Sequence, residues 1–157
     1  MLIIHTKAKW YIPIITETGD LPLGVHPASL RETLERFAFG TPQRKIVAMR
    51  LERIFRLAFA TGQVARFVVF GSFITEKSEP NDVDVFLLMK DSFDVSQLAG
   101  EVRFLFNHAA AQAHFGTSVF WLRRPAAHPN EQEAITDWQI KRDGTRRGIV
   151  EIIPEQP

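Results

Sequence analysis

The chain has 157 residues, of which 45% are hydrophobic and 24% are charged, so its size and composition are those of one ordinary globular domain. A net charge of +1 gives no overall field that would attract nucleic acid, and the absence of cysteine excludes disulfides and thiolate zinc sites. No apolar run reaches the length of a membrane span, and the first residues lack the long apolar core and cleavage site of a signal peptide. We therefore expect a cytoplasmic protein without a membrane segment, folded as a single domain over residues 1–157.

Residues 1–25 are expected to form an N-terminal extension with one or two short extended segments, at 2–5 and 10–15. A loop punctuated by glycine and proline follows over 19–27. The pattern leaves open whether this extension covers a functional site or packs beside it.

Two helix starts follow the extension. Ser29 and Glu32 have capping-box spacing, which predicts a helix that ends near Phe37. Thr41 precedes a proline at a first helical position, and apolar residues then recur at helical spacing up to Gly62. A second, longer helix is therefore predicted.

The remainder of the chain alternates between strands and helices. Apolar runs predict four strands, at 65–70, 82–89, 117–122 and 148–153. Apolar residues at helical spacing from Val95 to Ala109 predict one amphipathic helix that ends before Gly116.

Residues 130–133 have the composition of a further helix start. The order of the predicted elements favours the α/β (α+β) class, with helices packed against a small mixed β-sheet. The short link between the first two strands allows them to pair in antiparallel fashion.

Residues 66–89 are the most informative segment. An apolar run ends in Gly71 and Ser72, and a second apolar run opens with Asp82 and Asp84. Alternate strand residues share a face, so the two carboxylates point the same way and repel each other unless a cation lies between them. Hard divalent ions with oxygen ligands, Mg²⁺ or Mn²⁺, suit such a pair.

The end of the first strand indicates a phosphate site. Gly71 has no side chain, so a phosphate could approach the backbone there, and Ser72 adds a hydroxyl and an exposed N–H. Metal and triphosphate together indicate phosphoryl or nucleotidyl transfer. Lys77, in the loop between the strands, is either a further phosphate contact or a solvated lysine. The alternative to a metal site is that Asp82 belongs to a turn and that Asp84 is a solvated strand residue.

Gly71-Ser72, nine intervening residues and Asp82-x-Asp84 before an apolar run resemble the signature of the nucleotidyltransferase superfamily, whose members include DNA polymerase beta. A weaker likeness to small prokaryotic minimal nucleotidyltransferases rests on residues 21–27, 142–144 and 148–150. The resemblance implies a nucleotidyltransferase fold that uses a nucleoside triphosphate such as ATP as substrate. It makes Asp82 and Asp84 the catalytic and metal-binding residues.

The same resemblance implies that NMP moves from the triphosphate to a protein, RNA or small-molecule acceptor. Minimal members of the superfamily often modify a partner protein, so the likeness suggests an antitoxin-like role beside a toxin-like partner. The sequence leaves the acceptor, the preferred nucleotide and the oligomeric state open.

One element of the family pattern is missing. The superfamily has a third carboxylate on the strand beside Asp-x-Asp, near Ser118 here, and the strand 117–122 contains no acid. Glu101 or Glu151 could supply it from another element, or each is an ordinary surface carboxylate. The alternative function is a catalytically degenerate module that binds nucleotide or a protein partner, so whether the chain is an enzyme is left open.

Two further groups of residues carry weaker hypotheses. Arg142, Arg146 and Arg147 flank a glycine turn and either bind triphosphate or RNA backbone or form a solvated loop. A set of aromatic residues could include a base-stacking surface, although core packing explains them better. These are Phe104, Phe106, Phe115, Phe120 and Trp121.

Overall fold

The structure is a computed structural model that describes residues 11–155. A five-stranded mixed sheet with strand order β1-β5-β2-β3-β4 forms its centre. The strands are β1 (Val25–Ala28), β2 (Val64–Phe70), β3 (Asp84–Met89), β4 (Ser118–Arg123) and β5 (Ile149–Ile152). β2 runs antiparallel to β3 and β5, whereas β1 is parallel to β5 and β4 is parallel to β3. The predicted mixed sheet and its antiparallel central pair are confirmed.

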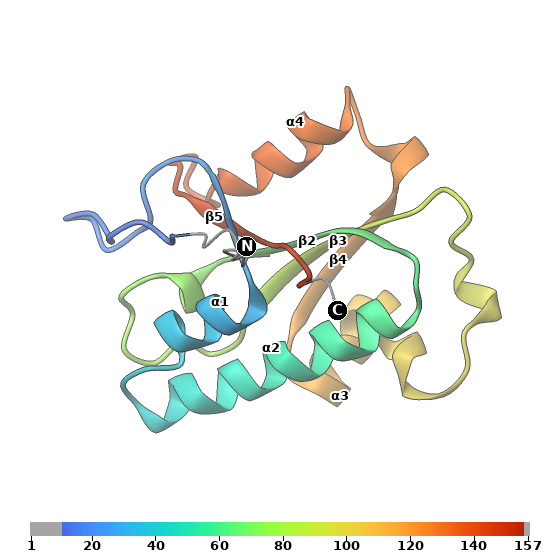
Figure 1. Ribbon diagram of the computed structural model, residues 1–157, viewed down its shortest axis with the longest axis horizontal. Coiled ribbons are helices and arrows are strands. Elements are labelled where there is room, and N and C mark those ends of the chain that lie inside the picture. The colour runs from blue at the N-terminus through green and yellow to red at the C-terminus, as the bar shows by residue number, and fades with distance from the viewer. Residues whose placement is uncertain (1–10, 156–157) are drawn as a thin grey trace, which may run out of the picture.

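Helices cover both faces of the sheet (Figure 1). They are α1 (Leu30–Phe37), α2 (Pro42–Ala60), α3 (His108–Phe115) and α4 (Glu131–Thr136). Short 3-10 turns complete the connections: η1 (Ser72–Ile74), η2 (Val95–Gln97), η3 (Gly100–Phe106), η4 (Arg124–Ala126) and η5 (Asp137–Gln139). No helix in the described range is long and apolar enough to cross a membrane.

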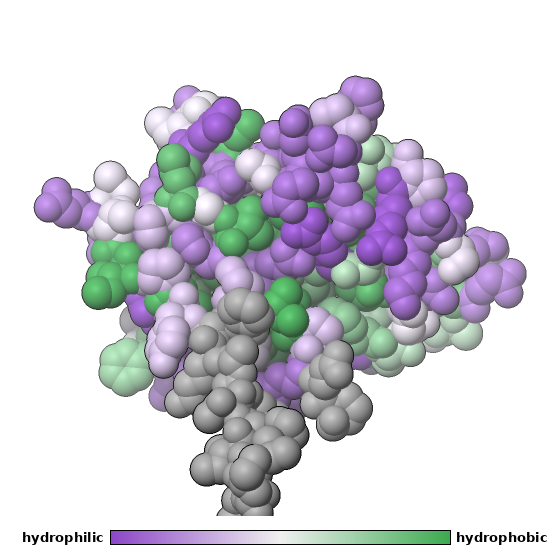
Figure 2. All heavy atoms as spheres, turned by 45° about the horizontal axis from the view of Figure 1, so that its top comes forward, coloured by the Kyte–Doolittle hydropathy of each residue, from purple (hydrophilic) through white to green (hydrophobic). Residues whose placement is uncertain are grey.

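The two faces of the sheet bury separate apolar clusters. Val85 and Leu87 of β3 point to the larger cluster, which is covered by α1, α2 and α3. Phe86 and Leu88 point to a smaller cluster that contains Ile135 of α4. Asp84 has the same parity as Phe86 and therefore shares the α4 face. The surface on this side is mostly hydrophilic, with hydrophobic residues exposed between polar ones (Figure 2).

The predicted helix starts are confirmed by their caps. Ser29 Oγ accepts from the Glu32 N–H at 3.0 Å, and Thr41 Oγ1 accepts from the Arg44 N–H at 3.3 Å. Asn130 caps α4 in the same way. The four predicted strands agree with β2 to β5 to within two residues at each end.

The loop prediction for residues 19–27 is wrong at its end, because β1 begins at Val25. This strand has four residues and pairs only with β5, through the register Val25 with Ile149. The hydrogen bonds of β1 are made with a strand more than a hundred residues away, so no local sequence pattern predicts it. The extended segment predicted at 2–5 lies outside the described residues, and residues 11–15 form no regular element.

The single helix predicted from Val95 to Ala109 is also wrong. The segment forms η2 and η3, and the α-helix begins only at His108. Gly100 has φ of +77°, a left-handed conformation that a continuous α-helix through this position cannot contain. Asn107 is extended and caps α3 by accepting from the Ala110 N–H at 2.9 Å. The backbone conformations of Gly100 and Asn107 therefore prevent one continuous helix, although the apolar residues recur at helical spacing.

The loop between β2 and β3, residues 71–83, is held in place by one buried side chain. Arg44 of α2 is 6% exposed, and its guanidinium donates to four backbone carbonyls. Three of them belong to this loop: Phe73 at 2.8 Å, Thr75 at 2.5 Å and Lys77 at 2.5 Å. The fourth is Phe37 at the end of α1, at 3.0 Å. Burial lowers the pKa of Arg44, because the guanidinium loses most of its contact with water.

We expect Arg44→Met to destabilise the protein by about 2–4 kcal/mol, because it leaves buried carbonyls without a donor. For a chain of this size the loss lowers the midpoint of thermal unfolding by roughly 5–15 °C. Lys45→Met is the matched control, since Lys45 is the next residue and is exposed. An Arg44→Met variant that unfolds at the wild-type temperature in a calorimetric scan would contradict this role.

Candidate functional site

The two aspartates lie at the edge of the sheet where β3 begins. Asp84 is the first residue of β3, and Asp82 precedes it by two positions. Asp84 is flanked in register by Phe70 on β2 and by Ser118 on β4. The core residue Val83 lies between the two acids and is completely buried, as expected where alternate residues face opposite sides.

Gly71 gives Asp84 the space that it occupies. Gly71 has φ of +85°, and a Cβ at this position would overlap Oδ2 of Asp84. The carboxylate therefore lies directly against the backbone at the end of β2. Any side chain at Gly71 would be strained and would displace the acid. The sequence singled out Gly71 for phosphate access, and the structure adds this second reason for a glycine.

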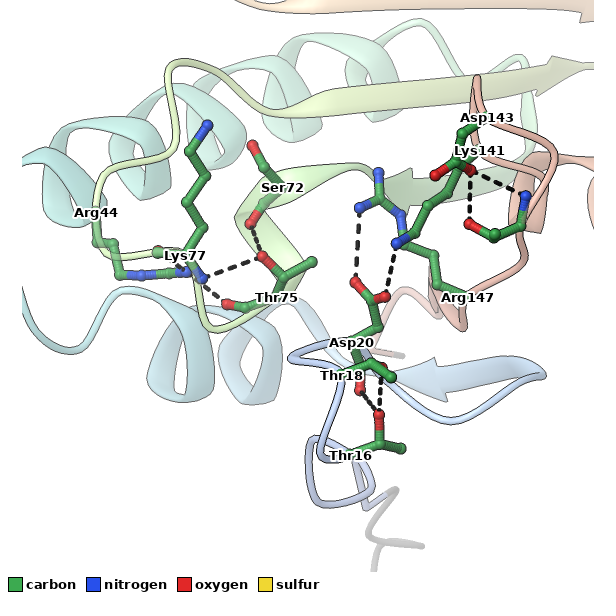
Figure 3. Close-up of polar contacts among 11 residues, drawn as sticks. Thr16, Thr18, Asp20, Arg44, Ser72, Thr75, Lys77, Lys141, Asp143 and Arg147 are labelled. Carbon is green, nitrogen blue, oxygen red and sulfur yellow. Dashed lines mark hydrogen bonds and ion pairs between the residues drawn. The ribbon is translucent and has the colours of Figure 1, made fainter.

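Ser72 and Lys77 belong to the loop that Arg44 holds. The Ser72 carbonyl accepts from the Thr75 hydroxyl at 2.6 Å, which closes the turn and leaves the Ser72 side chain pointing away from it (Figure 3). The Lys77 backbone is fixed by Thr75 and Arg44, while its side chain is exposed. The structure thus fixes the backbone of both residues and leaves the lysine ammonium accessible.

Ser118 stands where the resemblance to nucleotidyltransferases implies a third acid, and its strand, β4, pairs with β3 as expected. The Ser118 hydroxyl donates to Asp82 Oδ2 at 3.0 Å and accepts from the Gln112 side-chain amide at 3.1 Å. This chain of hydrogen bonds orients Asp82 but supplies no further negative charge.

The two glutamates considered as replacements are engaged elsewhere. Glu151 forms a two-pronged ion pair with Arg66, at 2.8 and 2.5 Å. Glu101 pairs with Arg53 at 2.5 Å and with His114 at 2.9 Å. Within residues 11–155 no three His, Asp or Glu side chains are grouped as metal ligands. A metal ion at Asp82 and Asp84 would therefore take its remaining oxygens from water or phosphate.

The pKa of Asp84 is raised from 3.8 to about 6. Burial is the main cause, and the negative charge of Asp82 is the second. The Ser118 hydroxyl and the positive charges of Arg147 and Arg142 oppose the shift. The site therefore holds an acid that is poorly solvated and would gain from a bound cation.

Basic side chains approach the acids from the turn before β5. Arg147 and Arg142 lie close enough to act on Asp84, and Arg147 is half-buried rather than a solvated loop residue. Arg146 is exposed. Asp20 pairs with Lys141 Nζ at 2.8 Å and with Arg147 Nη1 at 3.7 Å (Figure 3). Sequence reasoning missed this role of Asp20, because only the fold brings it to the turn.

The segment before β1 and the turn before β5 are locked together. The Gly148 N–H donates to the Leu21 carbonyl at 3.0 Å, and the Gly24 N–H donates to Gln139 Oε1 at 2.6 Å. A Cβ at Gly148 would overlap the Pro22 carbonyl. Residues 21–24 therefore pack beside the turn that carries Arg147. Residues 1–10 of the predicted extension lie outside the described range, so whether the whole extension covers the site stays open.

We expect Asp84→Asn to stabilise the metal-free protein above about pH 6. Because the folded pKa of about 6 exceeds the ordinary 3.8, the native state retains a proton that the unfolded chain has released. The stability of the wild type therefore falls as the pH rises through this window, by an amount on the order of 2 kcal/mol.

Chemical denaturation in chelator at pH 4 and at pH 7.5 checks this prediction. The variant should match the wild type at the lower pH and exceed it at the higher pH, while the exposed control Asp91→Asn follows the wild type at both. Equal stability of Asp84→Asn and wild type at pH 7.5 would contradict the raised pKa.

Comparison with known proteins identifies a family. No curated protein and no solved structure matches the chain. A family model described as "Family of unknown function (DUF6932)" matches residues 13–153. The matched range contains all five strands, both aspartates and the turn that carries Arg147. The chain belongs to this family, DUF6932.

Proposed function

We propose that the protein binds a nucleoside triphosphate with Mg²⁺ or Mn²⁺ at Asp82 and Asp84 and transfers its nucleoside monophosphate to an acceptor. The observation that supports this most is the mixed charge around Asp84, whose ionised form is disfavoured by the Asp82 carboxylate and favoured by the positive charges of Arg147 and Arg142. A metal–triphosphate complex carries both signs of charge, so it complements the whole site. A bare cation or a bare anion would satisfy only half of it.

Each side chain has a role in this proposal. Asp82 and Asp84 hold the metal ion, and Ser118 orients Asp82 through its hydrogen bond. The arginines and Lys77 neutralise phosphate oxygens, and the Ser72 hydroxyl contacts them. The bound metal supplies further positive charge against the phosphates.

The transfer itself exchanges one phosphorus–oxygen bond for another. An acceptor oxygen forms a bond to the α-phosphorus, the bond from that phosphorus to the bridging oxygen breaks, and pyrophosphate leaves with the electron pair. The acceptor proton passes to solvent or to a base that the acceptor brings, because the described site holds no third carboxylate.

The acceptor in this proposal is a macromolecule that brings its own reactive group. Residues 11–155 form one sheet with its covering helices, and a macromolecule that brings its own reactive group needs no separate unit to hold it. A toxin-like protein partner in the cytoplasm fits the superfamily resemblance best, and RNA is the alternative acceptor.

A second candidate function is a nucleotide-binding module without turnover. This module without turnover is favoured by Ser118, which stands where an enzyme of the superfamily would have an acid. It is also favoured by the ion pairs of Glu101 and Glu151 with arginines, because these pairs engage both carboxylates outside the site. A serine hydroxyl is no general base at neutral pH, and loss of such a base typically lowers a rate by about 10²–10⁴-fold. The two candidates share the binding site and differ only in whether transfer follows.

Isothermal titration with each nucleoside triphosphate in Mg²⁺, and then in EDTA, tests the shared site. We expect Mg²⁺-dependent binding that Asp82→Asn or Asp84→Asn abolishes, because each removes a charged metal ligand. Asp91→Asn should bind like the wild type, since this residue is exposed beyond the other end of β3. If both site variants bind as the wild type does, the site is assigned wrongly.

Ser118→Asp separates the two candidates, because it restores an acid in register with Asp84. We expect Mg²⁺ affinity to rise by roughly tenfold or more, since affinity follows the number of charged ligands. Ser118→Asn, of similar shape and uncharged, is the control. With α-labelled triphosphate, label transfer by the wild type supports the enzyme, and transfer by Ser118→Asp alone supports the module. No change in Mg²⁺ affinity would show that position 118 does not reach the metal.

A further inference from the structure

Aromatic rings gather beside the aspartates on the α4 face of the sheet. Phe70 is the register partner of Asp84 on β2. Phe120 lies two residues beyond Ser118 on β4 and therefore points to the same face. The acids and these rings thus share one surface of the sheet.

Trp138 of η5 joins the rings into one patch. Its ring centroid lies 4.6 Å from that of Phe70 and 5.2 Å from that of Phe120. The His108 ring also lies against Phe120, with ring centroids 4.8 Å apart and the planes tilted by 35°. We call Phe70, Phe120, Trp138 and His108 the aromatic patch; the buried Phe86 lies beneath it, 4.9 Å from Trp138.

Phe120 and His108 are the exposed members of the aromatic patch, whereas Phe70 and Trp138 pack against the smaller apolar cluster. Phe120 is 37% exposed, Phe70 and Trp138 are half-buried, and His108 is exposed. The other four aromatics that the sequence offered for base stacking pack with the larger core on the opposite face. They are Phe104, Phe106, Phe115 and Trp121. Of that set, Phe120 alone faces the acids.

The position of the aromatic patch fits the part of a nucleotide that the acids do not bind. Two residues along a strand span about 7 Å, so Phe120 lies that far along β4 from the row that contains Asp84 and Ser118. In a nucleotide a ribose separates the α-phosphate from the base. A base stacks on an aromatic face without needing hydrogen bonds of a particular pattern.

We propose that the aromatic patch receives the nucleobase of the nucleotide whose phosphates lie at Asp82 and Asp84. This assignment rests on the proposed function and adds to it the residues that recognise the base. It makes Phe120 the central contact, because its ring adjoins Phe70, Trp138 and His108.

The test compares a ligand with a base and one without. Titration calorimetry in Mg²⁺ measures the tightest-binding nucleoside triphosphate and inorganic tripolyphosphate against wild type, Phe120→Ala and Phe120→Leu. We expect both variants to bind the nucleotide about 5- to 100-fold more weakly, and tripolyphosphate as the wild type does. Phe120→Leu retains apolar bulk without a ring face. Phe39→Ala is the control, because Phe39 is 84% exposed and lies between α1 and α2.

Three results would overturn the inference. If both Phe120 variants bind the nucleotide with wild-type affinity, the base lies elsewhere while the proposed function stands. If they lose both ligands and the wild type binds both, the aromatic patch is structural. If the wild type binds neither ligand, the proposed function fails and the base site fails with it.

Discussion

The confinement of Asp84 beside Asp82 is the constraint on which the rest of the site depends. Burial and a neighbouring negative charge both disfavour the ionised carboxylate, which raises its pKa to about 6. The surroundings reduce this cost without removing it: Ser118 donates to Asp82, and Arg142 and Arg147 lie near enough to attract Asp84. A protein optimised for stability alone would not keep two acids there, so the arrangement is typical of a binding site.

The framework around the acids is built largely from backbone contacts. Gly71 lets the Asp84 carboxylate lie against the chain, and Arg44 fixes the following loop through three of its carbonyls. Gly148 allows the N-terminal segment to pass directly over the turn that carries Arg147. These backbone contacts fix where Asp84 and the turn that carries Arg147 lie.

Much of the fold followed from local patterns, and each failed prediction has a physical cause. The caps at Ser29 and Thr41 were predicted because side-chain oxygens satisfy helix N–H groups within four residues. The helix predicted from Val95 failed because Gly100 takes a left-handed conformation. Arg44 could have been noticed, since it occupies the same face of α2 as the buried Val47 and Leu51, where a charge is out of place. Nothing in the sequence around Asp20 indicated that its carboxylate pairs with Lys141 and Arg147.

The sequence by itself determined four of the five strands and the starts of α1, α2 and α4, allowed the antiparallel pairing of β2 with β3, and indicated a common face for Asp82 and Asp84. All of these depend on side-chain periodicity or on short connections, which act between near neighbours in the chain. Only the tertiary structure decided that Asp20 meets Lys141 and Arg147, that Glu101 and Glu151 are paired with arginines, and that Phe120 shares the sheet face of Asp84. These contacts join residues from different strands, turns and helices, so they exist only once the sheet has set its strand order and register.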